Sequence, residues 1–164
     1  MKVIGLDNGT TGSLSVYDTE LNVMALHNLP TKKELSFQKQ AKNITRIDFP
    51  KLCELLTQIK KGENNIHCFM ERPFTGGSKM VNTSLISFRC FEAEIIALEE
   101  CEIGYTVISS KEWQKKLLPK GISGSKELKK AAYDVAKRLY PYLAEKLNLS
   151  NADSVLIAHN FRGI

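Results

Sequence analysis

Three acidic residues stand where their side chains could act together. Asp7 ends the first apolar run of the chain and precedes a turn-forming segment, Asn8-Gly9-Thr10-Thr11-Gly12. Glu71 ends a second apolar run, and Asp153 opens the last helical stretch. A carboxylate at the end of a buried strand is unfavourable unless a positive group meets it. Three such acids in a basic chain predict a divalent-metal site and the chemistry of a nuclease.

Mg²⁺ suits this set of ligands because it is a hard ion that prefers oxygen and often shares phosphate oxygens with its substrate. Two such ions, roughly 3.5–4 Å apart, can activate water and stabilise the leaving oxygen of a phosphodiester. Each acid also has a simpler interpretation. Asp7 can be a turn residue, Glu71 can pair with Arg72, and Asp153 can be a helix-starting acid that suits the helix dipole.

The bulk composition is that of one globular domain spanning residues 1–164, with 43% apolar and 25% charged residues. No apolar run approaches the length of a membrane span, and the start of the chain lacks a signal-peptide pattern. We therefore expect no membrane partner and a cytoplasmic location. The four cysteines form no CxxC pair, which favours reduced thiols over a zinc site or disulfides.

Positive charge is concentrated in residues 109–146, which carry ten Lys/Arg and four acids, whereas the whole chain has a net charge of +5. A polyanion such as nucleic acid would meet this segment first. The alternative is an ordinary solvated helix face. The candidate DNA contacts in the segment are Lys115, Lys116, Lys126, Lys129 and Lys130.

Hydrophobic periodicity predicts five strands and five helices. The strands are expected at 3–6, 13–17, 23–29, 66–70 and 105–108, and the helices at about 50–61, 81–101, 110–113 and 125–140, with a last helix from about Asn151. The polar and basic stretch 30–47 is expected to be a surface loop.

This order predicts an α/β fold with a five-stranded mixed sheet, three antiparallel strands followed by two parallel ones, flanked by helices on both faces. The strand at 66–70 is reached through a helix, so it should pair parallel with the first strand. Asp7 and Glu71 would then lie at the carboxyl ends of neighbouring strands, where open α/β sheets usually bind ligands. Asp153 joins them if the last helix packs beside the first strand.

Three segments together resemble the RuvC family of Holliday-junction resolvases, in particular its compact phage-type members. Residues 4–12 resemble the family's G-[IL]-D-P-G-x-x-x-G opening, residues 70–74 its E-x-x-F segment, and residues 152–158 its A-D-A-L-x-[IL]-A helix. Each motif is weak alone, but all three occur in the family's order. The resemblance implies an RNase H-like fold and a bacterial cell or a phage-infected host.

The resemblance implies that Asp7, Glu71 and Asp153 hold Mg²⁺ or Mn²⁺ and cut branched DNA. It also implies that Phe74 stacks on bases at the junction, which is reasonable because Pro73 and two glycines would present the ring on a loop. The alternative for Phe74 is a core residue that closes the loop.

Two lysines also follow from the resemblance. The family's lysine–glutamate pair resembles Lys126-Glu127, which makes Lys126 a phosphate ligand near the scissile bond. A second family lysine falls at Lys115, with an offset of one residue, while Trp113 is expected to pack rather than to bind.

The chain departs from the family in two places. Asn8 replaces the usual proline, which a turn tolerates. The family places an acid or histidine three residues before the last aspartate, where this chain has Ser150 followed by Asn151. Either the fourth ligand is absent, a neutral oxygen or water substitutes, or His159 contributes. For His159 a structural role is favoured, because it does not share a helix face with Asp153.

A two-fold symmetric junction cut on opposing strands calls for a homodimer. Following the family, we expect helix 81–101 at its interface. The acids of this helix region are expected to face away from DNA: Glu92, Glu94, Glu99, Glu100 and Glu102.

The predicted function is therefore a Mg²⁺-dependent, structure-selective endodeoxyribonuclease. One alternative is a branched-DNA-binding module that lost catalysis. Another is a kinase-type domain of the actin-like superfamily, whose phosphate loop residues 5–12 also resemble, although such enzymes need two domains. The same chemistry on flap DNA or RNA also stays open.

Overall fold

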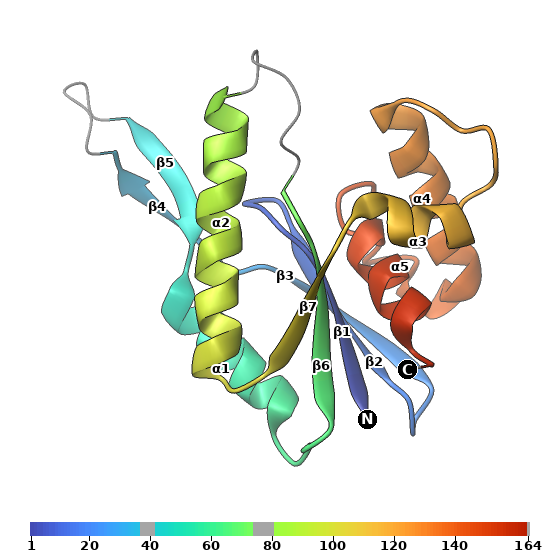
Figure 1. Cartoon of the computed structure of the whole chain (residues 1–164), viewed down its shortest axis with the longest axis horizontal. Helices are drawn as coiled ribbons and strands as arrows, with labels where there is room; N and C mark the ends of the chain where they lie inside the picture. The colour runs from blue at the N-terminus through green and yellow to red at the C-terminus, as the bar shows by residue number, and fades with distance from the viewer. Residues whose placement is uncertain (37–41, 74–80, 164) are drawn as a thin grey trace.

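The centre of the molecule is a five-stranded sheet in the order β3-β2-β1-β6-β7 (Figure 1). The computed structural model describes residues 1–36, 42–73 and 81–163. β1 pairs antiparallel with β2 and β2 with β3, whereas β1–β6 and β6–β7 are parallel pairs. The predicted α/β fold and mixed sheet are confirmed. The strands are Lys2–Asp7 (β1), Ser13–Asp18 (β2), Val23–Asn28 (β3), Ile66–Glu71 (β6) and Gly104–Ile108 (β7).

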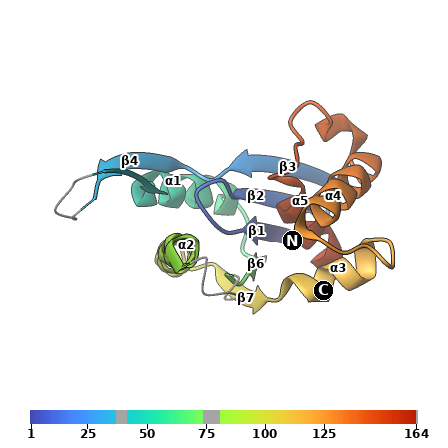
Figure 2. The same ribbon diagram turned by 90° about the horizontal axis from the view of Figure 1, so that it is seen from above.

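Helices cover both faces of this sheet, as predicted. Figures 1 and 2 show α1 and α2 on one side and α3, α4 and α5 on the other. The helices are Phe49–Lys60 (α1), Val81–Glu100 (α2), Ser110–Leu117 (α3), Ser125–Leu139 (α4) and Ala152–Phe161 (α5), with a short 3-10 helix at Pro141–Leu143 (η2). No helix among the described residues is long and apolar enough to cross a membrane.

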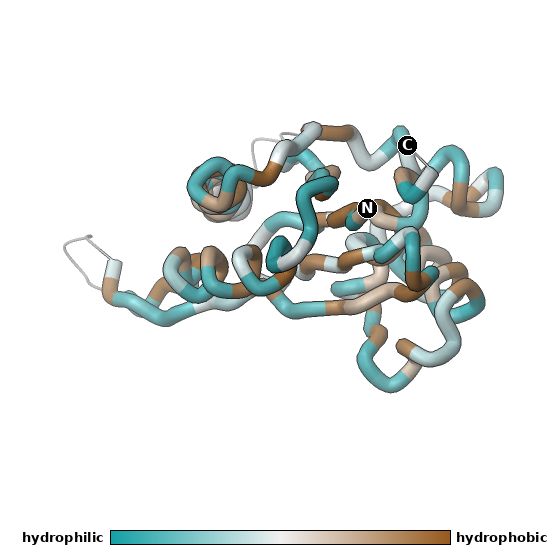
Figure 3. Tube along the Cα trace, turned by 90° about the horizontal axis from the view of Figure 1, so that it is seen from below, coloured by the Kyte–Doolittle hydropathy of each residue, from teal (hydrophilic) through white to brown (hydrophobic). Residues whose placement is uncertain are grey.

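The two faces of the sheet bury separate hydrophobic cores. On β1, Val3 packs under α4 and α5, whereas its neighbour Ile4 packs under α1 and α2. On β6, Phe69 and Cys68 divide in the same way. This explains the continuous apolar runs in the sequence, because strands buried on both faces need no polar alternation. Figure 3 shows hydrophobic segments gathered in the middle of the molecule.

The stretch 30–47, expected to be a loop, instead contains a two-stranded sheet. β4 (Thr31–Leu35) pairs antiparallel with β5 (Asn43–Ile47). The loop prediction was wrong because most residues of this stretch are polar or charged, which hides the alternation of a strand. The anchoring residue is Ile47, which is buried in the core beneath α1 and α2.

All four cysteines are free thiols, and Cys68 and Cys90 are buried in the same core.

Candidate active site

Two of the three predicted acids lie side by side at one edge of the sheet. Asp7 is the last residue of β1, and Glu71 is the last residue of the parallel neighbour β6. The register pairs Leu6 with Met70, so the next residue of each strand is one of these acids. The side chain of Asn8 donates a 2.7 Å hydrogen bond to the backbone oxygen of Glu71 and so ties the turn after β1 to the end of β6.

The third acid reaches the same edge because α5 packs closely against β1. A Cβ atom on Gly5 would lie 2.2 Å from the backbone oxygen of Ser154 and 2.4 Å from the backbone nitrogen of Ala158. Only glycine allows this approach. Asp153 lies in the first turn of α5, next to Ser154. The position of the Asp153 carboxylate therefore depends on the absence of a side chain at Gly5.

A buried serine cluster fixes the start of α5. The hydroxyl of Ser154 lies 2.7 Å from the hydroxyls of Ser13 and of Ser15, which both belong to β2. All three side chains are fully buried. Buried hydroxyls need partners, so these hydrogen bonds favour one position of the helix along the strand.

The three acids interact electrostatically. Burial, followed by the charges of Asp153 and Glu71, raises the pKa of Asp7 well above its ordinary value. Burial raises the pKa of Glu71 to about 7, and that of Asp153 to about 6. The positive charge of Lys129 acts in the opposite direction on all three pKa values. Carboxylates that oppose each other's ionisation in this way would be stabilised by a cation between them.

The chemistry of these residues fits a hard divalent ion, because all three offer carboxylate oxygens. Within residues 1–36, 42–73 and 81–163, no group of three or more acid, histidine or cysteine side chains is arranged to hold a metal ion. The acids thus converge on one edge without closing around a common point. The metal assignment of Asp7, Glu71 and Asp153 stays a prediction.

Lys129 is the lysine whose positive charge lowers the pKa of all three acids. Lys126, expected at the scissile phosphate, is exposed in the first turn of α4, one turn before Lys129. Lys130 is also exposed on α4, and Lys115 is exposed on α3. Lys116, also exposed on α3, lies over the ring of Phe161, 5.9 Å from its centroid. The DNA contacts of all these lysines stay predictions, and Phe74 lies outside the described residues.

Trp113 contacts the site through a hydrogen bond that sequence reasoning missed. The expected packing is confirmed, since the side chain is fully buried. In addition, its indole N–H donates a 2.9 Å hydrogen bond to Oε2 of Glu71, which works against the rise in that residue's pKa. Trp113 therefore orients one of the three candidate ligands.

Glu94, which was expected to face away from DNA, is a fourth acid close to the site. It is fully buried, and its Oε1 accepts a 3.3 Å hydrogen bond from the backbone N–H of Gly9, in the turn after Asp7. Burial raises the pKa of Glu94 to about 8. The helical spacing of Cys90, Glu94 and Leu98, all buried, was the signal in the sequence. Because the Glu94 carboxyl accepts from the Gly9 N–H, this donor is not free to bind a phosphate, as the phosphate loop of a kinase-type domain would require.

The three residues considered as substitutes for a fourth ligand have other partners. The hydroxyl of Ser150 donates to Oδ1 of Asn148 at 2.6 Å. Asn151 is buried, donates to the backbone oxygen of Lys146 at 2.9 Å and accepts from the Asn148 N–H at 2.8 Å. Nδ1 of His159 lies 2.7 Å from the hydroxyl of Tyr140, in agreement with a structural role.

No family model matches this chain, and no curated protein matches it either. Among the solved structures that share its fold are two of RuvC. RuvC of T. thermophilus in complex with a Holliday junction substrate has a TM-score of 0.60 at 11% identity. The Thermus thermophilus RuvC structure has a TM-score of 0.57 at 12% identity. Each comparison covers 98% of this chain and 92% of the other. A yeast mitochondrial Holliday junction resolvase has a TM-score of 0.46 at 17% identity, over 98% of this chain and 78% of that one. The chain therefore has a RuvC-like, RNase H-like fold.

Proposed function

We propose that this protein is a structure-selective endodeoxyribonuclease that cuts four-way DNA junctions in the presence of Mg²⁺, with Mn²⁺ as a substitute. The observation that carries the proposal is the convergence of Asp7, Glu71 and Asp153 on one edge of a RuvC-like sheet. A second support is that a solved structure with this fold is bound to a Holliday junction substrate.

In this proposal the three carboxylates would hold the metal, which supplies an activated water and stabilises the leaving oxygen of the phosphodiester. Trp113 keeps the Glu71 carboxylate in one orientation, and the buried Ser154 fixes the turn of α5 that carries Asp153. Lys129 adds positive charge beside the acids, where it favours the approach of a phosphate.

The paired cuts of a symmetric junction call for two copies of the site, and we propose a homodimer. Helix α2 supports this proposal, because it exposes 42–56% of each of four large apolar side chains: Leu85, Ile86, Phe88 and Ile96. Apolar residues gathered on one helix usually mark an interaction surface. The four free thiols support a reducing, cytoplasmic location in a bacterial cell or a phage-infected host.

A gel assay with four-way junction, flap and linear duplex DNA tests the function. With Mg²⁺ or Mn²⁺ the protein should cleave the junction, and with EDTA it should not. Asp7→Asn should abolish cleavage while junction binding in Ca²⁺ persists, because the substitution removes charge and keeps the side-chain shape.

Two results of this assay would contradict the proposal. Cleavage of linear duplex as fast as of the junction would remove structure selectivity. Tight junction binding without metal-dependent cleavage would favour the non-catalytic binding module. The lack of a preformed metal-binding group among the described residues and the lack of an acid at position 150 support that alternative.

A further inference from the structure

The net positive charge of this chain comes from two segments. Residues 31–47 hold five Lys/Arg and one acid, and residues 109–146 hold ten Lys/Arg and four acids. The remaining residues hold eight Lys/Arg and thirteen acids. Residues 31–47 therefore carry a net charge of +4 and residues 109–146 a net charge of +6, whereas the rest of the chain is acidic.

These two segments lie on opposite sides of the candidate active site. The β4–β5 hairpin extends on the α1 and α2 side of the sheet, whereas α3 and α4 lie on the other side (Figures 1 and 2). The carboxyl ends of β1 and β6, which carry Asp7 and Glu71, lie between them (Figure 1). A polyanion seated on the acids and on α4 would therefore extend toward the hairpin if it continued across the molecule.

Internal ion pairs neutralise only part of the hairpin's charge. Glu34 pairs with Lys32 at 2.7 Å and with Arg46. Lys33 and Lys42 are exposed, and neither takes part in an ion pair in the described part of the chain. Two lysines of the hairpin are therefore available to an external anion.

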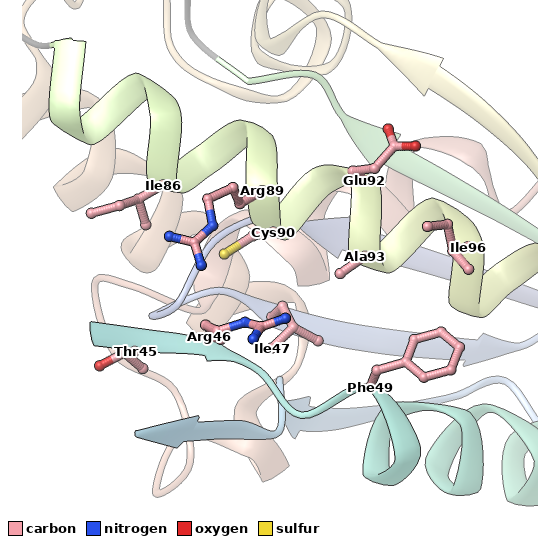
Figure 4. A pocket seen from close by; sticks show the side chains of 10 residues that line it. All are labelled: Thr45, Arg46, Ile47, Phe49, Ile86, Arg89, Cys90, Glu92, Ala93 and Ile96. Carbon is pink, nitrogen blue, oxygen red and sulfur yellow. The ribbon is translucent and has the colours of Figure 1, made fainter. Parts of the chain in front are cut away.

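A further cation comes from the neighbouring helix. Arg89 of α2 and Arg46 of β5 line one cavity of about 290 Å³ between the hairpin and α2 (Figure 4). Guanidinium groups are well suited to phosphate oxygens. A two-stranded ribbon also has a shape that a DNA groove can accommodate. Charge and shape together favour nucleic acid over a protein partner for the hairpin.

We propose that the β4–β5 hairpin is a second DNA-binding element, which holds the phosphate backbone of a junction arm at a distance from the cleaved position. This inference rests on the proposed function, because it assumes that branched DNA is the substrate. The hairpin contributes affinity through Lys33 and Lys42. It gives the protein contacts to the arm that lies on the far side of the acids from α4.

The test compares the double variant Lys33→Ala/Lys42→Ala with a matched control, Lys51→Ala/Lys61→Ala, which removes two exposed lysines from α1 and the residue that follows it. Junction binding is measured in Ca²⁺ at several salt concentrations. Each lost phosphate contact should reduce the slope of log K against log[salt] by about 0.9. The hairpin variant should thus lose about 1–2 units of slope, and the control should keep the wild-type value.

A second arm of the experiment uses junctions whose arms are shortened stepwise. Wild-type affinity should fall once an arm no longer reaches the hairpin, and the hairpin variant should show no such step. If the wild type binds and cleaves junctions but both double variants keep its salt slope, the inference is overturned and the proposed function stands. If the wild type neither binds nor cleaves junctions, the proposed function fails, and the inference fails with it.

Discussion

Gly5→Ala tests how the third acid is positioned. The added Cβ would start 2.2 Å from the Ser154 backbone oxygen, and real Cβ contacts essentially never fall under 3.0 Å, so α5 must move away from β1 by at least the difference, 0.8 Å. Both opposing groups are backbone, so no side-chain rotation can relieve the clash. Overpacking of a core typically costs about 1–3 kcal/mol.

The same shift would stretch the hydrogen bonds from Ser154 to Ser13 and Ser15, each now 2.7 Å long. Each buried bond contributes roughly 0.5–1.5 kcal/mol. The total loss is then on the order of 2–6 kcal/mol, which corresponds to a fall in Tm of about 4–24 °C for a chain of this size. Cleavage should fall further than the folded fraction does, because Asp153 moves together with α5.

Thermal unfolding followed by circular dichroism gives the stability, and junction cleavage is measured at a temperature where the variant stays folded. Gly163→Ala is the matched control, because its added Cβ would meet no atom within 4 Å. A Gly5→Ala protein with unchanged Tm and unchanged cleavage would refute the close packing of α5 on β1 as the device that positions Asp153.

Three further predictions concern the surroundings of the acids. The pKa of Glu94 lies at about 8 instead of 4.5, so the folded state keeps a proton that the unfolded state loses, and the stability of the metal-free protein should fall as pH rises from 5 to 8. Glu94→Gln should make that fall shallower, by about 3 kcal/mol between pH 5 and 7 in urea unfolding, and an unchanged slope would contradict the assignment. Trp113→Phe removes the hydrogen-bond donor to Glu71, so the pKa of Glu71 should rise above about 7. The acidic limb of the pH–rate profile should then move to higher pH. An identical profile in the variant would count against a role of Trp113 in setting this pKa. Lys129→Ala should lower the single-turnover cleavage rate more than Lys126→Ala does, and the reverse order would return the phosphate role to Lys126.

The centre of the sheet was predictable because β1 and β6 are apolar on both faces and each ends on an acid. Val3 and Ile4 enter different cores, and such a run has no other low-energy place in a small protein. The parallel pairing of β1 with β6 then followed from the intervening helix, and it brought Asp7 and Glu71 together. These conclusions need only local pattern and the rules of chain connection.

The features that were missed depend on contacts between distant parts of the chain. Glu94 accepts its hydrogen bond from a residue 85 positions away, and Trp113 donates to one 42 positions away. A glutamate on a helix normally faces solvent, so only its place among buried neighbours indicated otherwise. The β4–β5 hairpin was not predicted because its exposed lysines mask the alternation of a strand.

The central claim is that three separate carboxylates form one divalent-metal site, and Mn²⁺ binding tests it most directly. Isothermal titration, together with the electron paramagnetic resonance signal of free Mn²⁺, would measure the affinity of the wild type and of three variants: Asp7→Asn, Glu71→Gln and Asp153→Asn. We predict saturable binding by the wild type and a loss of at least tenfold in affinity in every variant. Binding that is unchanged by any one of the substitutions, in a variant that still folds, would contradict the claim.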